Sequence, residues 1–141
     1  MYRILIVEDD QTITSAIQKR LNSWGIEACG IRDFKNVVSE FSQQNPHLVL
    51  MDISLPFFNG YHWCNEIRRI SKVPIIFLSS MADNMNIVMA MNMGADDFIA
   101  KPFDMEVLVA KVSALLRRTY DFAATTGIVE VRGAILNTSD A

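Results

Sequence analysis

The chain has 141 residues, half of them hydrophobic and 21% charged, and its formal net charge at pH 7 is −3. This length and composition predict one globular domain of ordinary size and exclude an intrinsically disordered chain. The acidic balance argues against a nucleic-acid-binding surface, and no apolar run approaches the roughly 20 residues that span a bilayer. We also expect no signal peptide, and we expect Cys29 and Cys64 to be buried free thiols in a reducing cytoplasm.

Five apolar runs in the sequence predict five strands. These runs cover residues 2–7, 26–31, 47–51, 75–78 and 96–100. The third run is continuously apolar from Leu48 to Met51, which is too long for a half-exposed strand. It fits a central strand of a parallel sheet that is covered on both faces.

Helical spacing of apolar residues follows each predicted strand. The first helix is predicted to begin at the N-cap Asp10 and to stop at Gly25. Asp33 is predicted to cap the second helix, and Gly94 to end a fourth helix that starts near Asp83. The apolar face of the first helix is predicted to contain Ile13, Ala16, Ile17, Leu21 and Trp24.

Strands and helices therefore alternate five times, which predicts an α/β fold: a doubly wound parallel sheet with right-handed crossovers and helices on both faces. Beyond residue 120 the pattern changes, with a linker over residues 121–126 and one or two strands with a Gly turn over residues 127–136. Two short strands cannot form a core. We interpret residues 1–120 as the domain and residues 121–141 as a linker and a tail, a sheet extension or the start of a second domain.

Polar side chains stand where the predicted strands end. Glu8 and Asp9 follow the first strand and Asp52 the third, while Ser79 and Lys101 follow the fourth and fifth. In open α/β sheets, ligands bind at the carboxyl ends of the strands. Three neighbouring carboxylates would repel one another unless a cation joined them, and their hard oxygen ligands suit Mg²⁺. A lysine and a hydroxyl could then hold phosphoryl oxygens while a carboxylate acts as the nucleophile.

Each of these residues alone has an ordinary structural explanation. An acidic pair before a helix is commonly a cap, and Asp52 by itself could simply start a turn. A Ser pair after a strand and a Lys-Pro pair are common in turns and loops. Their coincidence at successive strand ends favours a phosphoryl-transfer site.

Several short motifs carry a more specific signal. They are the acidic pair Glu8–Asp9, Asp52 with Leu55–Pro56 and Asn59–Gly60, the hydroxyl of Ser79, and residues 94–103 with the sequence Gly-Ala-Asp-Asp-Phe-Ile-Ala-Lys-Pro-Phe. In these motifs the chain resembles the receiver domain of bacterial two-component response regulators, over roughly residues 2–118. The resemblance implies a flavodoxin-like five-stranded sheet of order 2-1-3-4-5 with five helices.

In that family, the aspartate of the third strand accepts a phosphoryl group from a sensor histidine kinase. The resemblance implies that Asp52 is the acceptor, that Asp9 is a direct Mg²⁺ ligand, and that Glu8 binds the metal through water. The backbone carbonyl of Ser54 would complete the protein ligands, and Lys101 would pair with the phosphoryl group. The implied role is a signalling phosphoacceptor with Mg²⁺-dependent self-phosphorylation and autodephosphorylation only, not a turnover enzyme.

The resemblance also implies a conformational switch between Ser79 and Phe98. In the family, phosphorylation draws the hydroxyl inward, and an aromatic side chain of the fifth strand follows it. Ser79 stands where Thr is usual and Phe98 where Tyr is common, so we expect a less sharply two-state switch. The peptide bond Lys101–Pro102 is expected to be cis.

The predicted fourth helix has no charged residue after Asp83, and a helix that is apolar nearly all round exposes part of that surface. Regulators of the winged-helix (OmpR/PhoB-type) class dimerise through the fourth helix, fifth strand and fifth helix. The resemblance implies a two-fold homodimer through six residues of this face: Ile87, Met91, Asp97, Val107, Lys111 and Arg118. The alternative is that this apolar surface is only core and scattered surface residues.

The loop of residues 54–60 carries Phe57 and Phe58 where the family usually has small or acidic residues. We expect one of the two to be exposed beside Asp52 and to serve as a docking surface. With residues 61–64, this loop resembles regulators of the bacitracin and peptide-antibiotic-responsive subgroup of Gram-positive bacteria. His47 and His62 match nothing in the site, and we interpret both as structural.

The tail after Tyr120 resembles the start of a winged-helix DNA-binding domain. The resemblance therefore implies a cytoplasmic transcription regulator whose C-terminal half is missing from this chain. The expected partners are a sensor histidine kinase and a second copy of the chain. DNA would be bound only through the missing C-terminal domain, and no membrane contact is expected.

Three other functions stay open at this point. A metal-dependent phosphatase with an Asp nucleophile usually has a second carboxylate two residues on, where this chain has Ser54. A flavodoxin-like cofactor binder usually has a phosphate loop rich in Ser, Thr and Gly after its first strand, where this chain has acidic residues. A receiver-like domain that only mediates assembly would not require the full acidic set.

Overall fold

The computed structural model describes residues 1–80 and 84–121, and within this range the side chains of residues 84–87 are not described. Residues 1–109 form one compact unit, and the residues from 110 onward are described by themselves. The predictions for Asp83 and for the tail of residues 122–141 lie outside the described residues.

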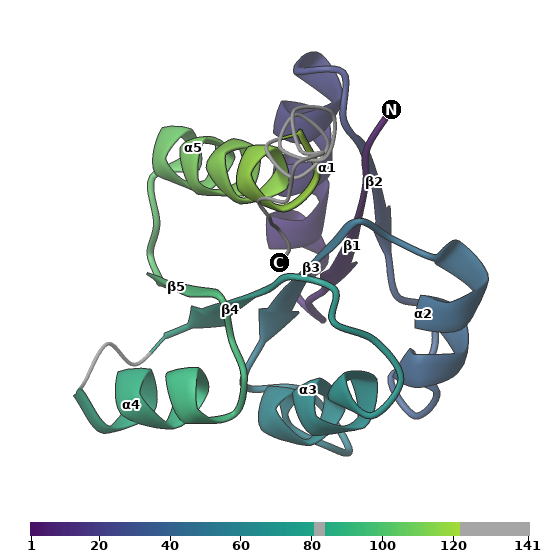
Figure 1. The fold of residues 1–141 in the computed structure, drawn as a ribbon, viewed down its shortest axis with the longest axis vertical. Helices are drawn as coiled ribbons and strands as arrows, with labels where there is room; N and C mark the ends of the chain where they lie inside the picture. The colour runs from purple at the N-terminus through teal and green to yellow at the C-terminus, as the bar shows by residue number, and fades with distance from the viewer. Residues whose placement is uncertain (81–83, 122–141) are drawn as a thin grey trace, which may run out of the picture. The chain divides into compact units, whose positions relative to one another are not determined.

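The five predicted strands are confirmed. They are β1 (Arg3–Val7), β2 (Glu27–Gly30), β3 (Leu48–Asp52), β4 (Ile75–Ser79) and β5 (Asp97–Ala100). They form one sheet of order β2-β1-β3-β4-β5, in which each neighbouring pair is parallel (Figure 1). The predicted doubly wound fold and its strand order are therefore confirmed.

The helices are α1 (Gln11–Ser23), α2 (Val37–Gln44), α3 (Gly60–Arg68), α4 (Asn84–Asn92) and α5 (Met105–Leu116), and a π-helical turn, Arg117–Asp121, follows α5. Figure 1 shows α1 on one face of the sheet and α2, α3 and α4 on the other. None of the helices in the described ranges is long and apolar enough to cross a membrane.

The core of this unit lies against the central strands. Every residue of β3 and β4 is buried, as expected for strands covered on both faces. On the face covered by α2, α3 and α4, side chains of β1, β3 and β4 pack with helical residues. The strands contribute Leu5, Val7, Val49, Met51, Ile75 and Phe77 to this cluster, and the helices contribute Val37, Phe41, Trp63, Cys64, Ile67 and Ala90.

Helix α1 begins where the sequence predicts, and its buried face differs from the prediction. Asp10 is its N-cap and accepts hydrogen bonds from the amides of Thr12 (2.9 Å) and Ile13 (3.3 Å). Trp24 was predicted to face the core, yet it is 59% exposed, because the helix ends at Ser23 and Trp24 has left the helical phase. Ala16 is also exposed. The buried residues of α1 are Thr14, Ile17 and Leu21.

The predicted N-cap of α2 is wrong. The helix begins at Val37 after Asn36, four residues later than Asp33. Asp33 instead stabilises a turn before the helix, since it accepts hydrogen bonds from the amide of Lys35 (3.0 Å) and from Asn36 Nδ2 (2.7 Å). The predicted stops at Gly25 and Gly94 are confirmed, with φ angles of 77° and 100°.

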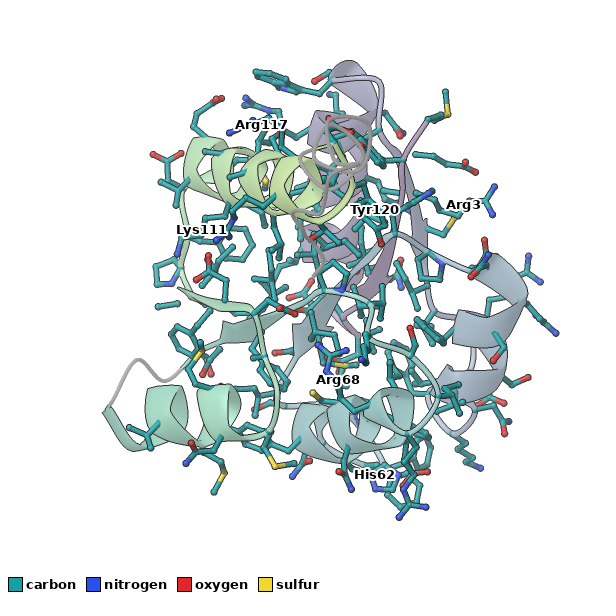
Figure 2. The ribbon with its side chains drawn as sticks, viewed as in Figure 1. Arg3, His62, Arg68, Lys111, Arg117 and Tyr120 are labelled. Atoms are coloured by element: carbon teal, nitrogen blue, oxygen red, sulfur yellow. The ribbon has the colours of Figure 1, made fainter. Side chains whose placement is uncertain are left out.

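Helix α3 is fixed at both of its ends. At its start, the Gly60 amide donates to the carbonyl of Ile53 at 2.8 Å, so the helix begins directly against the end of β3. At its far end, Arg68 (Figure 2) donates through Nη2 to the Gly94 carbonyl (2.8 Å) and to Asp96 Oδ2 (3.1 Å). The same Asp96 oxygen accepts the amide of Ile75 at 2.9 Å. Helix α3 thereby connects the ends of three strands.

A substitution at Gly60 tests how tightly α3 meets β3. A Cβ atom on Gly60 would lie 2.2 Å from the backbone carbonyl oxygen of Asp52, which cannot move aside as a flexible side chain could. We expect Gly60→Ala to lower the free energy of unfolding by about 3 kcal/mol in urea denaturation. Gly25→Ala is the control, because Gly25 has open space around its Cβ position and only its φ angle of 77° opposes alanine, at about 1 kcal/mol. An equal loss in both variants would contradict this description of the α3 start.

Candidate functional site

Three carboxylates meet at the carboxyl edge of the sheet. Glu8 and Asp9 follow β1, and Asp52 is the last residue of β3. One oxygen of each lies within 4.8 Å of an oxygen of the other two. Glu8 and Asp52 are buried, at 2% and 3% exposure, whereas Asp9 is exposed. The cluster is therefore closed on the protein side and open to solvent at Asp9.

Lys101 supplies the positive charge of this cluster. Its Nζ lies 2.7 Å from Glu8 Oε1 and 3.2 Å from Asp52 Oδ1, and both hydrogen bonds are charge-assisted. The Lys101 amide donates to the Ser79 carbonyl at 2.6 Å, which fixes the start of the loop after β5. The predicted cis peptide between Lys101 and Pro102 is confirmed.

The electrostatics of the site follow from burial and from these partners. Burial, and then the charge of Glu8, raise the pKa of Asp52 to about 6 from its ordinary 3.8, although Lys101 acts in the opposite direction. Burial acts to lower the pKa of Lys101, but the hydrogen bond to Glu8 and the charges of Asp52 and Glu8 outweigh it, so that this pKa is raised. Lys101 therefore stays protonated at neutral pH.

The three carboxylates have the composition of a divalent cation site. Carboxylate oxygens are hard ligands, and within the described residues one ammonium, that of Lys101, contacts two of the three carboxylates. The exposed side of Asp9 leaves room for the waters that a small dication retains. Glu8, Asp9 and Asp52 could therefore hold a metal ion. Ser54 is exposed and lies two residues after Asp52, in the loop that follows β3.

Sequence reasoning missed Thr14, which supports this cluster. Thr14 is 3% exposed, and its Oγ1 donates to the backbone carbonyl of Glu8 at 3.1 Å. Its spacing in the sequence could have predicted its burial, because Thr14 lies three residues before Ile17 and seven before Leu21, the other buried residues of α1. A polar residue in phase with a buried face needs a hydrogen-bond partner inside the protein.

The two residues of the predicted switch lie on neighbouring strands. Ser79 ends β4 and is 3% exposed. Phe98, on β5, is partly buried and packs against the core cluster of the α2–α4 face. Phe98 is paired with Phe77 of β4, two residues before Ser79.

The loop after β3 exposes both of its phenylalanines, of which the sequence predicted one. Phe57 is 66% exposed and has a φ angle of 69°, and Lys35 Nζ lies 4.8 Å from its ring centroid. Phe58 is 46% exposed and stacks on His62, with ring centroids 4.3 Å apart. His47 accepts the Arg3 amide at Nδ1, at 3.0 Å. Neither histidine belongs to the carboxylate cluster.

A mostly apolar pocket of about 480 Å³ lies beside Lys101. Thr12, Ile13 and Ala16 line it from α1, and residues of the loop after β5 line it from the other side. The exposure of Ala16, which the sequence did not predict, is explained by this pocket.

The residues of the predicted dimer face are partly described. Met91 and Val107 are 48% and 45% exposed, and Asp97 is partly buried. Val88 and Met89 add further exposed apolar area on α4, at 57% and 49%. Lys111 is partly buried and Arg118 is exposed. Both belong to the unit that begins at Ala110, and not to the compact unit of residues 1–109. The side chain of Ile87 is outside the described residues.

Comparison with known proteins connects this geometry to a family. The response regulator receiver domain family matches residues 4–113. Sensory transduction protein BceR of Halalkalibacterium halodurans is 48% identical over 124 residues, which are 88% of this chain and 54% of that protein. Response regulator protein GraR of Staphylococcus haemolyticus is 46% identical over 122 residues, which are 86% of this chain and 54% of that protein. The chain thus spans about half the length of these curated relatives.

A solved structure shows the same likeness. The N-terminal domain of the nisin resistance regulator NsrR, described as a lantibiotic response regulator, is 48% identical and superposes with a TM-score of 0.77. This match covers 83% of the present chain and 99% of that chain.

The raised pKa of Asp52 predicts how stability depends on pH in metal-free solution. The folded chain binds the Asp52 proton more tightly than the unfolded chain, so stability falls as pH rises from about 4 to about 6. We expect Asp52→Asn, which removes the charge, to be more stable than wild type by about 2 kcal/mol at pH 7.5 and to lose this part of the pH dependence.

Urea unfolding from pH 4 to 7.5 in the presence of EDTA measures this difference. Asp33→Asn is the control with the opposite sign, because hydrogen bonds to Lys35 and Asn36 lower the pKa of Asp33. Its carboxylate stabilises the fold above the ordinary pKa, and this contribution is lost as pH falls through the lowered value. The explanation fails if wild type and Asp52→Asn keep the same stability difference at pH 4 and at pH 7.5.

Proposed function

Because the chain belongs to the family of response regulator receiver domains, we propose that Asp52 accepts a phosphoryl group from a sensor histidine kinase and thereby controls a transcriptional output. One observation carries the proposal. The buried Asp52 carboxylate lies 3.2 Å from Lys101 Nζ and shares one cluster with Glu8 and Asp9. These are the groups that phosphoryl transfer to a carboxylate needs: a nucleophile, an ammonium and further oxygen ligands for a cation.

The transfer itself uses the carboxylate of Asp52 as the nucleophile. One of its oxygens attacks the phosphorus of a phosphohistidine, the P–O bond forms as the P–N bond breaks, and the imidazole leaves. With a pKa of about 6, Asp52 is mostly ionised at pH 7.5, and the nucleophile is therefore available. Lys101 and the hydroxyl of Ser79 pair with the phosphoryl oxygens. The phosphoryl group remains on the protein, which makes the chain a signalling phosphoacceptor and not a turnover enzyme.

Mg²⁺ is the cation we assign to the carboxylate cluster. Glu8, Asp9, Asp52 and the backbone carbonyl of Ser54 would hold it, and it would neutralise phosphoryl oxygens during self-phosphorylation and autodephosphorylation. The fit rests on the three carboxylates that converge within 4.8 Å and on the exposed side of Asp9.

Two exposed apolar surfaces, one beside Lys101 and one in the loop that follows Asp52, are available to the kinase. One is the apolar pocket between Ile13 of α1 and the loop after Lys101. The other is the pair of exposed rings of Phe57 and Phe58. A phosphohistidine must reach a buried carboxylate, so its carrier has to pack closely against such neighbouring surface.

The output follows from the likeness to longer relatives. BceR, GraR and NsrR carry names of sensory or response regulators, and NsrR is named for nisin resistance. We assign the chain to the peptide-antibiotic-responsive subgroup of OmpR/PhoB-type regulators, acting in the cytoplasm. DNA binding belongs to a C-terminal winged-helix domain that would follow residue 121 in the full regulator.

Phosphorylation would act through Ser79 and Phe98. The hydroxyl moves toward the phosphoryl group and the Phe98 ring moves into the space that it leaves. The dimer face then comprises Met91 and Val107, which are exposed, with Asp97, Lys111, Arg118 and Ile87. Its exposed methionine and valine side chains supply apolar area for a two-fold contact.

The phosphoacceptor proposal predicts a covalent adduct. After incubation with acetyl phosphate and Mg²⁺, we expect the intact chain to gain the mass of one phosphoryl group. Asp52→Ala should gain none, because it lacks the nucleophile, whereas the exposed control Asp33→Ala should behave as wild type. If the wild-type chain gains no phosphoryl group, the phosphoacceptor proposal is wrong, and the chain would instead be an assembly module.

The dimer proposal predicts a specific effect of charge on α4. Met91→Lys places an ammonium on the proposed face, where it would be desolvated in the dimer, so we expect dimerisation of the phosphorylated chain to weaken at least about tenfold. Ile70→Lys is the matched control, since Ile70 is 59% exposed and follows α3, outside this face. Sedimentation equilibrium measures both. Equal weakening in the two variants would show that added charge alone, and not this face, is responsible.

A further inference from the structure

We propose that Thr14 is a positioning residue for the acidic pair, because it holds the backbone on both sides of Asp9 and so sets where the Glu8 and Asp9 carboxylates lie. This inference rests on the proposed function in one respect, namely that these carboxylates bind Mg²⁺. Thr14 itself contacts neither the cation nor the phosphoryl group in this scheme.

The contacts of Thr14 define its role. Its Oγ1 donates to the carbonyl of Glu8 at 3.1 Å, and its backbone amide donates to the carbonyl of Asp10 at 3.0 Å. Glu8 and Asp10 are the two chain neighbours of Asp9. One residue of α1 therefore bonds the peptide group that precedes Asp9 and the carbonyl of the residue that follows Asp9.

The hydroxyl cannot easily point elsewhere. Thr14 is 3% exposed, and its methyl group Cγ2 lies 3.3 Å from the position that a Cβ on Gly30 would occupy. Gly30 ends β2 and is paired with Ile6 of β1. Gly30 has no side chain, which leaves room for this methyl group, and the stiff χ1 of threonine keeps Oγ1 directed at Glu8.

The Glu8 side chain is held separately. Oε1 accepts from Lys101 Nζ at 2.7 Å, and Oε2 accepts from the Asp10 amide at 3.1 Å. When a cation binds, the carboxylate has to share these oxygens, so the side-chain contacts change. The backbone contact from Thr14 does not involve the carboxylate, and it can keep Glu8 and Asp9 in place while the ligands rearrange.

An apolar residue would ordinarily suit the position of Thr14. It lies in phase with the buried Ile17 and Leu21, and Thr has a lower helix propensity than Leu or Ala. Without the hydroxyl, the buried carbonyl of Glu8 would lose this partner, which is unfavourable. The hydroxyl is thus the group whose removal tests the inference.

The test is a titration of metal-free chain with MgCl₂, followed by NMR through the amide shifts of residues 8–10. Thr14→Val keeps the shape and the backbone contact with Asp10 but removes the hydroxyl, and we expect its Mg²⁺ dissociation constant to rise about tenfold. Thr14→Ser retains the hydroxyl and should bind Mg²⁺ close to wild type. Thr14→Ala serves as a second hydroxyl-free variant if Thr14→Val does not fold, with the same expected direction.

The matched control is Gln18→Met. Gln18 lies on the same helix and donates through Nε2 to the Ala28 carbonyl at 3.4 Å, away from the acidic pair. Its loss should lower stability in urea unfolding and leave the Mg²⁺ dissociation constant unchanged. If Thr14→Val behaves in the same way as Gln18→Met, Thr14 is merely structural and the inference is overturned. If the wild-type chain itself shows no Mg²⁺-dependent shifts, the metal part of the proposed function fails, and the inference fails with it.

Discussion

The Lys101 ammonium between Glu8 and Asp52 is the contact on which the rest of the site depends. It joins the loop after β5 to the ends of β1 and β3 through hydrogen bonds of 2.7 and 3.2 Å. Two carboxylates that are 2% and 3% exposed would otherwise repel each other in a poorly solvated place. The parallel sheet order makes this contact possible, because it brings the carboxyl ends of the strands to one edge. The fold therefore serves chiefly to bring Glu8 and Asp52, which lie 93 and 49 positions before Lys101 in the sequence, to one ammonium.

Helix α3 extends the influence of this site across the sheet. Its first residue, Gly60, has no room for a Cβ against the Asp52 carbonyl, so the start of the helix packs directly on the backbone of Asp52. Its last residue, Arg68, donates to Gly94 and Asp96, which precede β5. The helix thus connects Asp52 with the segment that leads into the strand carrying Phe98. This connection offers a physical route, in addition to the proposed switch of Ser79 and Phe98, by which the state of Asp52 could reach the proposed dimer face.

Much of this arrangement could be predicted from the sequence, because it depends on local patterns. Apolar runs locate the strands, and the residue after each run lies at the carboxyl edge, which is sufficient to assemble Glu8, Asp9, Asp52 and Lys101. The predictions that failed required three-dimensional packing. Trp24 fits the apolar spacing of α1, but the helix ends one residue before it. Thr14 was missed because its burial follows from helical phase and from the absence of a side chain at Gly30, two features of different segments. The left-handed φ angle of Phe57 could not be predicted from the sequence, because phenylalanine rarely adopts this conformation.

The charge imbalance of the site explains why a stable fold retains a group that destabilises it. Three carboxylates converge on one ammonium, and burial together with the charge of Glu8 raises the pKa of Asp52 to about 6. An ionised Asp52 at neutral pH therefore opposes folding, since the unfolded chain would ionise it more readily. A ligand that binds only the folded chain stabilises the fold. A dication at Glu8, Asp9 and Asp52 would relieve the repulsion among the carboxylates, so it should both stabilise the fold and lower the pKa of Asp52. The surplus negative charge thus favours a cation at this edge of the sheet, and a bound cation would in turn keep Asp52 ionised.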